Sequence, residues 1–362
     1  MKNTINMKRN ILLITAMAIS NLINAQIPEG YEVAQWRGFS QAALTYSFDD
    51  GTPNQIPVAV PTLEKYGYRG TFNLVTDWVK DWSGWKSVSD NGHEIASHTI
   101  SHPYLDKMTA EQQTVELAKS KEIIEQNVGK ECITMVYPYC VRGIDSIVAD
   151  YYISARICCE SFSTPSPQNM FAIASRLVGT ESKYLRTPYD FNVWAELAAK
   201  ENGWCVYLIH GIDDDGGYSP IKSVDLDTHL KFVHDAEPIF WVGTFAEVSK
   251  YIIERNSLKI SEKQQGEETE ISVDVTAESK LTKFDCPITI KRRLPNGKGA
   301  IVTHNGKVVD SKIDDGCIIF DVVPGNTYLL VYDEGRMLLW TIFVVVGAIL
   351  LILSAMRKRV GA

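Results

Sequence analysis

Between residues 40 and 257, short apolar runs alternate with longer amphipathic segments. The apolar runs have the length of buried strands, and the amphipathic segments repeat with the period of helices packed on one face. Strands are expected at 42–48, 70–75, 94–97, 132–137, 153–158, 172–178, 204–209 and 240–243. Helices are expected at 58–66, 109–128, 191–200, 226–235 and 245–255. This alternation predicts a parallel α/β domain over 38–257, either a barrel or an open sheet.

The pattern changes after residue 257. Residues 258–269 are mostly polar and charged, and this composition predicts a linker. Runs with strand character follow at 271–275, 287–291, 300–303, 317–322 and 328–332. Turn sequences such as Asn305-Gly306 separate them. We therefore expect a small all-β domain of the sandwich type over 270–333.

The two ends of the chain predict export and a membrane anchor. Residues 1–25 have basic residues, an apolar run and a small final residue, as secretory signal peptides do. Residues 337–356 carry no charge and are long enough to cross a bilayer as a helix. The basic segment 357–359 follows and places the C-terminus in the cytoplasm. The folded part is then expected to be periplasmic or extracellular.

Charge and cysteine content narrow the classes of function. The chain has 44 acidic and 36 basic residues, a net charge of −8, which argues against nucleic acid as a partner. None of the seven cysteines forms a CxxC pair, so zinc-ribbon and thioredoxin-like motifs are excluded. Their pairing stays open: Cys286 and Cys317 are one candidate pair, and the adjacent Cys158 and Cys159 are not expected to bridge each other.

Two carboxylates stand where the first strand ends, at Asp49 and Asp50. In a regular strand neighbouring side chains face opposite sides, so both can serve one site only where the strand breaks. Gly51 permits that break. One carboxylate could then bind a metal while the other accepts a proton. An ordinary Asx turn is the alternative.

Histidines supply the other candidate groups. His98 and His102 are four residues apart, a spacing that places two imidazoles on one side of a helical turn and suits a zinc-like ion. The alternative is two polar residues in a turn. His93-Glu94 begins like a metalloprotease motif, but position 97 is serine, so that class is excluded. His210 closes the strand 204–209 at the same rim as the aspartates.

Taken in order, four short motifs resemble those of the polysaccharide deacetylase family, also called the NodB-homology or carbohydrate esterase 4 family. The resemblance covers about 38–257 and rests on SFDDG (47–51), GHEIASHTISH (92–102), YPY (137–139) and LIH (208–210). It implies a distorted (β/α) barrel of NodB type. It also implies that the protein removes acetyl groups from sugars with the help of a divalent metal ion, and zinc is the metal expected first.

The resemblance assigns roles to individual residues. The implied metal ligands are Asp50, His98 and His102. Asp49 would be the general base and His210 the general acid. The backbone N–H of Tyr139 would stabilise the oxyanion, and Leu208 would line the pocket for the acetyl methyl group.

The chain departs from the family pattern in two motifs. The family has an arginine two residues before Pro-Tyr, where this chain has Val136. We hypothesise that Arg156 or Arg176, on neighbouring strands, supplies the missing cation beside the base. The fourth motif has only a weak candidate in Asp190 with Trp194, and Asp190 is also the expected N-cap of helix 191–200.

Two classes of function follow. The first is a metal-dependent deacetylase of N- or O-acetylated carbohydrate, and deacylation of a different amide by the same site is a variant of it. The second is a catalytically inactive glycan-binding module, suggested by the missing arginine. Retention of both Asp49 and His210 favours the enzyme. Trp78, Trp82 and Trp85 are candidates for stacking on sugar rings, with at least one expected in the core.

Overall fold

The computed structural model describes residues 25–266, 268–295 and 298–333. The predicted signal peptide lies outside these ranges except for its last residue, and the predicted membrane helix at 337–356 lies wholly outside them. Within the described ranges, no helix combines the length and apolar character needed to cross a membrane. The membrane anchor therefore stays a prediction from the sequence.

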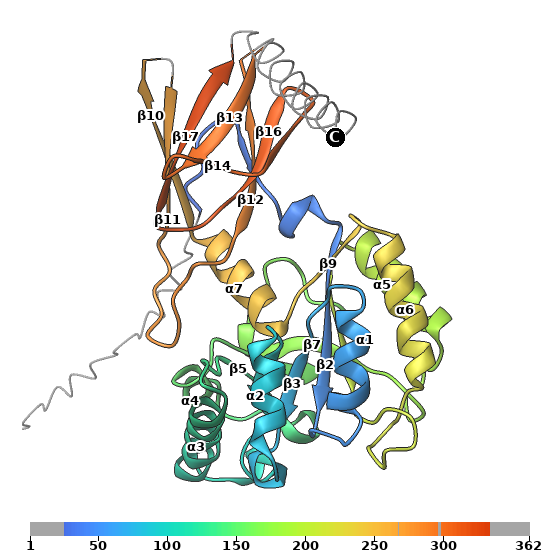
Figure 1. Ribbon diagram of the computed structural model, residues 1–362. Helices are drawn as coiled ribbons and strands as arrows, with labels where there is room; N and C mark the ends of the chain where they lie inside the picture. The colour runs from blue at the N-terminus through green and yellow to red at the C-terminus, as the bar shows by residue number, and fades with distance from the viewer. Residues whose placement is uncertain (1–24, 267, 296–297, 334–362) are drawn as a thin grey trace, which may run out of the picture.

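Seven parallel strands close into a barrel (Figure 1). They are β2 (Ala42–Asp49), β3 (Thr71–Leu74), β4 (Glu94–Ser97), β5 (Thr134–Val136), β6 (Ser154–Cys158), β7 (Ile173–Leu177) and β8 (Trp204–Ile209). Each strand pairs with the next in parallel, and β8 returns to β2. This topology confirms the expected (β/α) barrel.

The barrel is distorted around β2. One edge of β2 pairs with β8 along most of its length, from Ala43 to Phe48. The other edge is shared by two strands: β9 (Phe240–Val242) pairs with residues 42–44, and β3 pairs with residues 47–49. β9 therefore pairs with the start of β2, and β3 pairs with the end of β2, where Asp49 lies.

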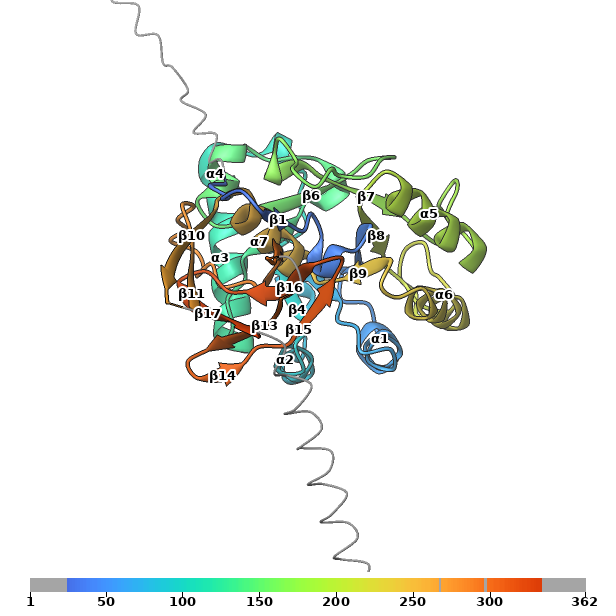
Figure 2. The ribbon, with the colours of Figure 1, turned by 90° about the horizontal axis from the view of Figure 1, so that it is seen from above.

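Helices surround the barrel. They are α1 (Val60–Glu64), α2 (Trp82–Asp90), α3 (Ala110–Val128), α4 (Asp145–Ala149), α5 (Pro188–Lys200), α6 (Ser223–Asp235) and α7 (Phe245–Asn256). Seen from above, α5 and α6 lie on one side of the barrel and α3 and α4 on the other (Figure 2). The helices cover an apolar core that includes Leu44, Phe48 and Phe72, all fully buried.

Threonine caps start three of these helices. Thr109, Thr187 and Thr244 each accept the N–H of the third helical residue, whose side chain accepts the N–H of the threonine. The prediction that Asp190 is the N-cap of α5 is wrong, since Thr187 takes that role and Asp190 completes its capping box. The helix therefore begins three residues earlier than expected.

Beyond the barrel, the chain forms two antiparallel sheets, ordered β1-β12-β16-β15 and β10-β11-β17-β13-β14. Their bounds are β1 (Tyr31–Val33), β10 (Leu258–Gln265), β11 (Glu268–Val275), β12 (Ile288–Arg293), β13 (Gly299–His304), β14 (Lys307–Val308), β15 (Ser311–Asp314), β16 (Cys317–Val322) and β17 (Asn326–Asp333). They share an apolar core that includes Ile271, Ile290 and Leu330. That they form a separate domain stays a prediction.

The prediction of a linker at 258–269 is wrong. Residues 258–265 form β10, which pairs along its whole length with β11. Leu258 and Ile260 are buried in the shared core, whereas residues 261–266 are exposed. The polar composition of this segment therefore marks the exposed end of a hairpin.

Candidate active site

The candidate groups meet at the carboxyl ends of the barrel strands. Asp49 ends β2, His98 follows β4, Tyr139 follows β5, and His210 follows β8. They line a cavity of about 500 Å³, together with Asp50, His102, Tyr137, Cys140, Cys158, Leu177, Leu208 and Tyr218. Each of the seven residues to which the family resemblance assigns a role is therefore in one cavity.

A backbone break turns both aspartates toward this cavity. Asp50 and Gly51 have φ values of 73° and 67°, in the left-handed region. The strand consequently ends at Asp49. The side chain of Asp50 therefore does not point to the opposite face of the sheet, as it would in a continuing strand. This is the break that Gly51 was expected to permit.

The expectation that His98 and His102 lie on a helical turn is wrong. Residues 98–102 form a loop, in which Thr99 and His102 have positive φ. The loop is held by Glu116 of α3, whose carboxylate accepts the N–H groups of Ile100 and Ser101 and the Ser101 hydroxyl. A loop fixed at its backbone by a buried carboxylate thus brings the two imidazoles together.

Asp50, His98 and His102 form a group that can hold a metal ion, with one potential ligand atom each, all within 4.8 Å of one another. The two Nε2 atoms are 3.1 Å apart, and Asp50 Oδ1 lies 3.6 Å from His98 Nε2 and 3.9 Å from His102 Nε2. The Val136 carbonyl is 2.9 Å from His98 Nδ1 and accepts its proton, which leaves Nε2 with a free lone pair.

The chemistry of these donors fits a divalent cation. Asp50 Oδ1 is buried and has no hydrogen-bond partner among the described residues. Burial and the neighbouring Asp49 raise the pKa of Asp50 to about 7, and burial lowers the pKa of His98 to about 3. Burial also lowers the pKa of His102. Two neutral imidazoles and a carboxylate oxygen that lacks a hydrogen-bond partner among the described residues are suited to a positive ion.

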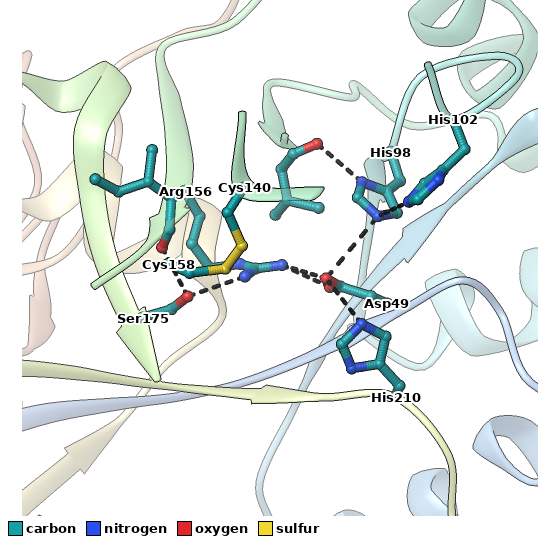
Figure 3. The surroundings of a disulfide bond; sticks show 10 residues. Asp49, His98, His102, Cys140, Arg156, Cys158, Ser175 and His210 are labelled. Carbon is teal, nitrogen blue, oxygen red and sulfur yellow. Dashed lines mark hydrogen bonds and ion pairs between the residues drawn. A yellow bond between two sulfur atoms is a disulfide. The ribbon is translucent and has the colours of Figure 1, made fainter. Parts of the chain in front are cut away.

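Asp49 is paired with Arg156, which extends from β6 (Figure 3). Arg156 Nη2 lies 2.7 and 2.5 Å from the two carboxylate oxygens, and the Asn73 amide donates to Oδ1 at 2.8 Å. Burial acts to raise the pKa of Asp49, but the Arg156 guanidinium, helped by His98 and His210, outweighs it, so the pKa lies below the usual value. Asp49 is therefore ionised at neutral pH.

Of the two arginines proposed to supply the missing cation, Arg156 lies beside Asp49. Arg156 Nη1 also donates to Ser175 Oγ at 2.9 Å, which fixes the plane of the guanidinium. Arg176 points elsewhere: its guanidinium lies over the rings of Tyr184 and Trp194, 4.7 and 4.0 Å from their centroids. The cation beside Asp49 thus comes from β6.

His210 faces Asp49 from the other side. Its Nε2 lies 4.0 Å from Asp49 Oδ2 (Figure 3). The His210 ring also contacts the Tyr218 ring edge-on. Burial lowers the pKa of His210, so the imidazole is neutral at rest near pH 7. Leu208, one residue before the end of β8, is buried at the cavity wall.

Several features of the site were not predicted. A disulfide joins Cys140 to Cys158 at the cavity wall, whereas Cys286 and Cys317, the pair considered from the sequence, are both free. No spacing rule indicates the Cys140 pairing, and only the strand order reveals it. Trp78 contacts the His102 ring at 5.2 Å and is half exposed, whereas Trp85 is buried.

The proposed fourth motif does not assemble in the cavity. Asp190 caps α5, and Trp194 packs against Arg176 and Phe162. His93 and Glu94 also have structural partners: His93 Nδ1 accepts the Gly70 N–H, and Glu94 accepts the Ala246 N–H.

Comparisons with known proteins identify a family over part of the chain. Residues 38–151 match the sequence model of the polysaccharide deacetylase family. These residues belong to that family. A peptidoglycan-N-acetylglucosamine deacetylase of Bacillus cereus is 27% identical over 134 residues, 31% of this chain and 49% of the relative. A gellan lyase of a Bacillus species is 26% identical over 329 residues, 83% of this chain.

The alignments span a minor part of these relatives, 13% of the gellan lyase and about half of the Bacillus cereus enzyme. Among solved structures, the Xyl-CE4 domain of a multidomain xylanase from the hindgut metagenome of Trinervitermes trinervoides is 18% identical. It covers 59% of this chain and 93% of that chain, with a TM-score of 0.43.

Proposed function

We propose that this chain is a metal-dependent hydrolase that removes acetyl groups from N- or O-acetylated carbohydrate. The observation that carries the proposal is the pairing of Asp49 with Arg156 beside the Asp50, His98 and His102 group in one cavity. A base held ionised next to a set of metal ligands suits hydrolysis of an acyl bond.

Asp50, His98 and His102 would hold the metal. When bound, a divalent ion such as zinc supplies a Lewis acid that lowers the pKa of water and polarises a carbonyl group. Asp49 stays anionic because the positive charge of Arg156 stabilises its carboxylate. The lone pairs of this carboxylate can then take a proton from an attacking water molecule. Asp49 is the proposed general base.

His210 is the proposed general acid. The imidazole is neutral at rest, because burial lowers its pKa. Asp49 Oδ2 lies 4.0 Å from His210 Nε2, so a proton taken by Asp49 has a second acceptor within the cavity. The imidazolium formed in this way can protonate the leaving amine or alkoxide.

Three further residues would bind the acetyl unit. The backbone N–H of Tyr139 is the proposed oxyanion donor, a role worth about 2.7–4 kcal/mol in the transition state. Leu208 and Leu177 give the cavity an apolar wall for the methyl group.

Exposed aromatic rings at the cavity mouth support a carbohydrate substrate. Tyr139 and Tyr218 are more than half exposed and line the cavity, and Tyr104 stacks on Tyr139 with 4.0 Å between ring centroids. Such faces suit the apolar sides of sugar rings. The Bacillus cereus relative is named a deacetylase of peptidoglycan N-acetylglucosamine, which supports an acetylated glycan as substrate here.

We also propose that the chain is exported and anchored by the helix expected at 337–356, with the barrel periplasmic or extracellular. The Cys140–Cys158 disulfide supports this location, because disulfides persist in oxidising compartments.

Acetate release from a panel of N- and O-acetylated glycans tests the activity. The expected result is release from at least one substrate, loss of release with a chelator, and recovery when zinc is restored. Binding of glycans without any release by the metal-loaded protein would instead favour the inactive glycan-binding module. Release that persists in chelator would contradict the metal mechanism.

A further inference from the structure

The disulfide between Cys140 and Cys158 joins two segments that each carry a group of the proposed reaction. Cys140 follows Tyr139, whose N–H is the proposed oxyanion donor. Cys158 ends β6, two residues after Arg156, which pairs with the base. The two cysteines are 18 residues apart in the chain, and Figure 3 shows their disulfide beside Arg156. Both cysteines line the cavity.

The turn at one end of the disulfide has an unfavourable backbone. Tyr139 and Cys140 have φ values of 53° and 61°, so two successive non-glycine residues are left-handed. This conformation is unfavourable for a residue with a side chain and persists only where its surroundings enforce it. The turn has two backbone hydrogen bonds, from Cys140 N to Tyr137 O at 3.1 Å and from Val141 N to Pro138 O at 3.0 Å. A covalent link adds a constraint that these bonds do not supply.

The other end of the disulfide holds the strand that carries Arg156. The ladder between β5 and β6 ends at the pair Val136 and Arg156, and the Tyr137 N–H then donates to Arg156 O at 3.3 Å. The disulfide continues this connection two residues further along β6. On the opposite edge, Cys158 pairs with Ser175 of β7, whose hydroxyl accepts from Arg156 Nη1. The end of β6 is therefore tied on both sides.

We propose that the Cys140–Cys158 disulfide is a positioning element that holds the Tyr139 turn and Arg156 in register for the proposed deacetylation. Breaking it frees the turn to leave its left-handed conformation and loosens the end of β6. Both groups act on the reacting centre, so turnover falls while substrate affinity changes little. This inference rests on the proposed function.

Reduction of the purified full chain is the first test. A phosphine reductant converts the disulfide to two thiols while the phosphine takes one oxygen atom from water and becomes the phosphine oxide. A phosphine is preferred to a dithiol, since thiolates bind zinc. We expect kcat to fall on the order of 10-fold to 100-fold, with KM nearly unchanged and the bound metal retained. Unchanged kcat in fully reduced protein would overturn the proposal.

Variants separate the disulfide from other thiols. Cys140→Ser, Cys158→Ser and the double variant should show the same loss of kcat, and phosphine should have no further effect on them. Cys159→Ser is the matched control, because Cys159 is the exposed free thiol next to Cys158. Its kcat should equal that of the unchanged protein, and it should remain sensitive to phosphine. A fall in kcat with Cys159→Ser equal to that with Cys158→Ser would contradict the assignment.

Hydrogen exchange gives a readout that does not depend on activity. The backbone amides of residue 137 and of residues 139–142 should exchange faster in the reduced protein and in Cys140→Ser than in the oxidised chain or Cys159→Ser. If the oxidised protein releases no acetate from any substrate, the proposed function fails, and the exchange measurement still tests the disulfide. Equal exchange in the oxidised and reduced forms would overturn the positioning role.

Discussion

Arg156 and Asp49 form a buried ion pair across the barrel, with one guanidinium nitrogen 2.7 and 2.5 Å from the two carboxylate oxygens. The pair joins β6 to the end of β2, two strands that are not neighbours in the barrel. A buried pair of this kind is weak evidence for stability, because desolvation offsets the attraction. Its position beside Asp50, His98 and His102, the proposed metal ligands, indicates a role in holding Asp49, the proposed general base, ionised.

Arg156→Gln should therefore shift the pH dependence of the reaction. Without the guanidinium, burial dominates and raises the pKa of Asp49. The base works only when ionised, so the acid limb of the kcat/KM profile should move to higher pH. Measuring kcat/KM at a series of pH values from 4 to 9 detects this shift of the acid limb.

Arg176→Gln is the control for that series. Arg176 is also a strand arginine, but it stacks on Tyr184 and Trp194. The acid limb of the kcat/KM profile of Arg176→Gln should coincide with that of the unchanged protein. Equal shifts in both variants would show that the Arg156 pair has no special role.

Removing a metal ligand should abolish metal binding in a folded protein. His98→Ala is expected to lose stoichiometric zinc, measured by elemental analysis after dialysis, and to lose activity with it. His234→Ala changes a half-exposed histidine on α6 and should retain the metal. Full zinc occupancy in His98→Ala would contradict the assigned ligand set.

Glu116 should affect metal affinity without touching the metal. Its carboxylate holds the backbone of Ile100 and Ser101, and Gln cannot accept all three hydrogen bonds with the same strength. Glu116→Gln should weaken zinc binding roughly 10-fold to 100-fold, as changes in groups that support metal ligands do. Calorimetric titration with zinc measures this. A Kd equal to that of the unchanged protein would show that the loop holds its shape without Glu116.

Glu254 predicts a pH dependence of stability. Burial raises its pKa from 4.5 to about 7, although its Oε2 accepts the Cys286 N–H. Between pH 4.5 and 7 the folded chain keeps a proton that the unfolded chain has released, so the free energy of unfolding falls as pH rises through this window. The fall attributable to Glu254 is at most about 3 kcal/mol.

Glu254→Gln removes this titration and keeps the acceptor for Cys286. Denaturant unfolding at pH 5 and pH 8 should therefore show a smaller loss of stability in the variant than in the unchanged chain. Equal losses in the two proteins would show that Glu254 does not titrate in this range.

Strand periodicity and strand ends are local properties, so the sequence predicted a parallel α/β domain. The barrel and the roles of the residues in its cavity were predicted from the resemblance of four motifs to the polysaccharide deacetylase family. Asp49 and His210 each follow an apolar run, and parallel strands bring such ends together. The geometry of His98 and His102 was not predictable, because it depends on positive φ at Thr99 and His102. A spacing of four alone indicates a helix.

The choice between Arg156 and Arg176 required the register of β6 against β7. Arg156 pairs with Ile173, so Ser175 lies on the same face as Arg156, and Arg176 lies on the opposite one. The sequence predicted that both arginines lie on strands. It did not predict which of them faces the inside of the barrel. The strand β10 was missed for a different reason: only Leu258 and Ile260 are apolar in a segment with an otherwise polar edge.

The most direct test of the central claim compares acetate release by zinc-loaded unchanged protein and zinc-loaded Asp49→Asn on the same acetylated glycan panel. The account predicts release by the unchanged protein and a loss on the order of 10²-fold to 10⁴-fold in Asp49→Asn at equal zinc content. Equal rates in the two proteins would contradict it.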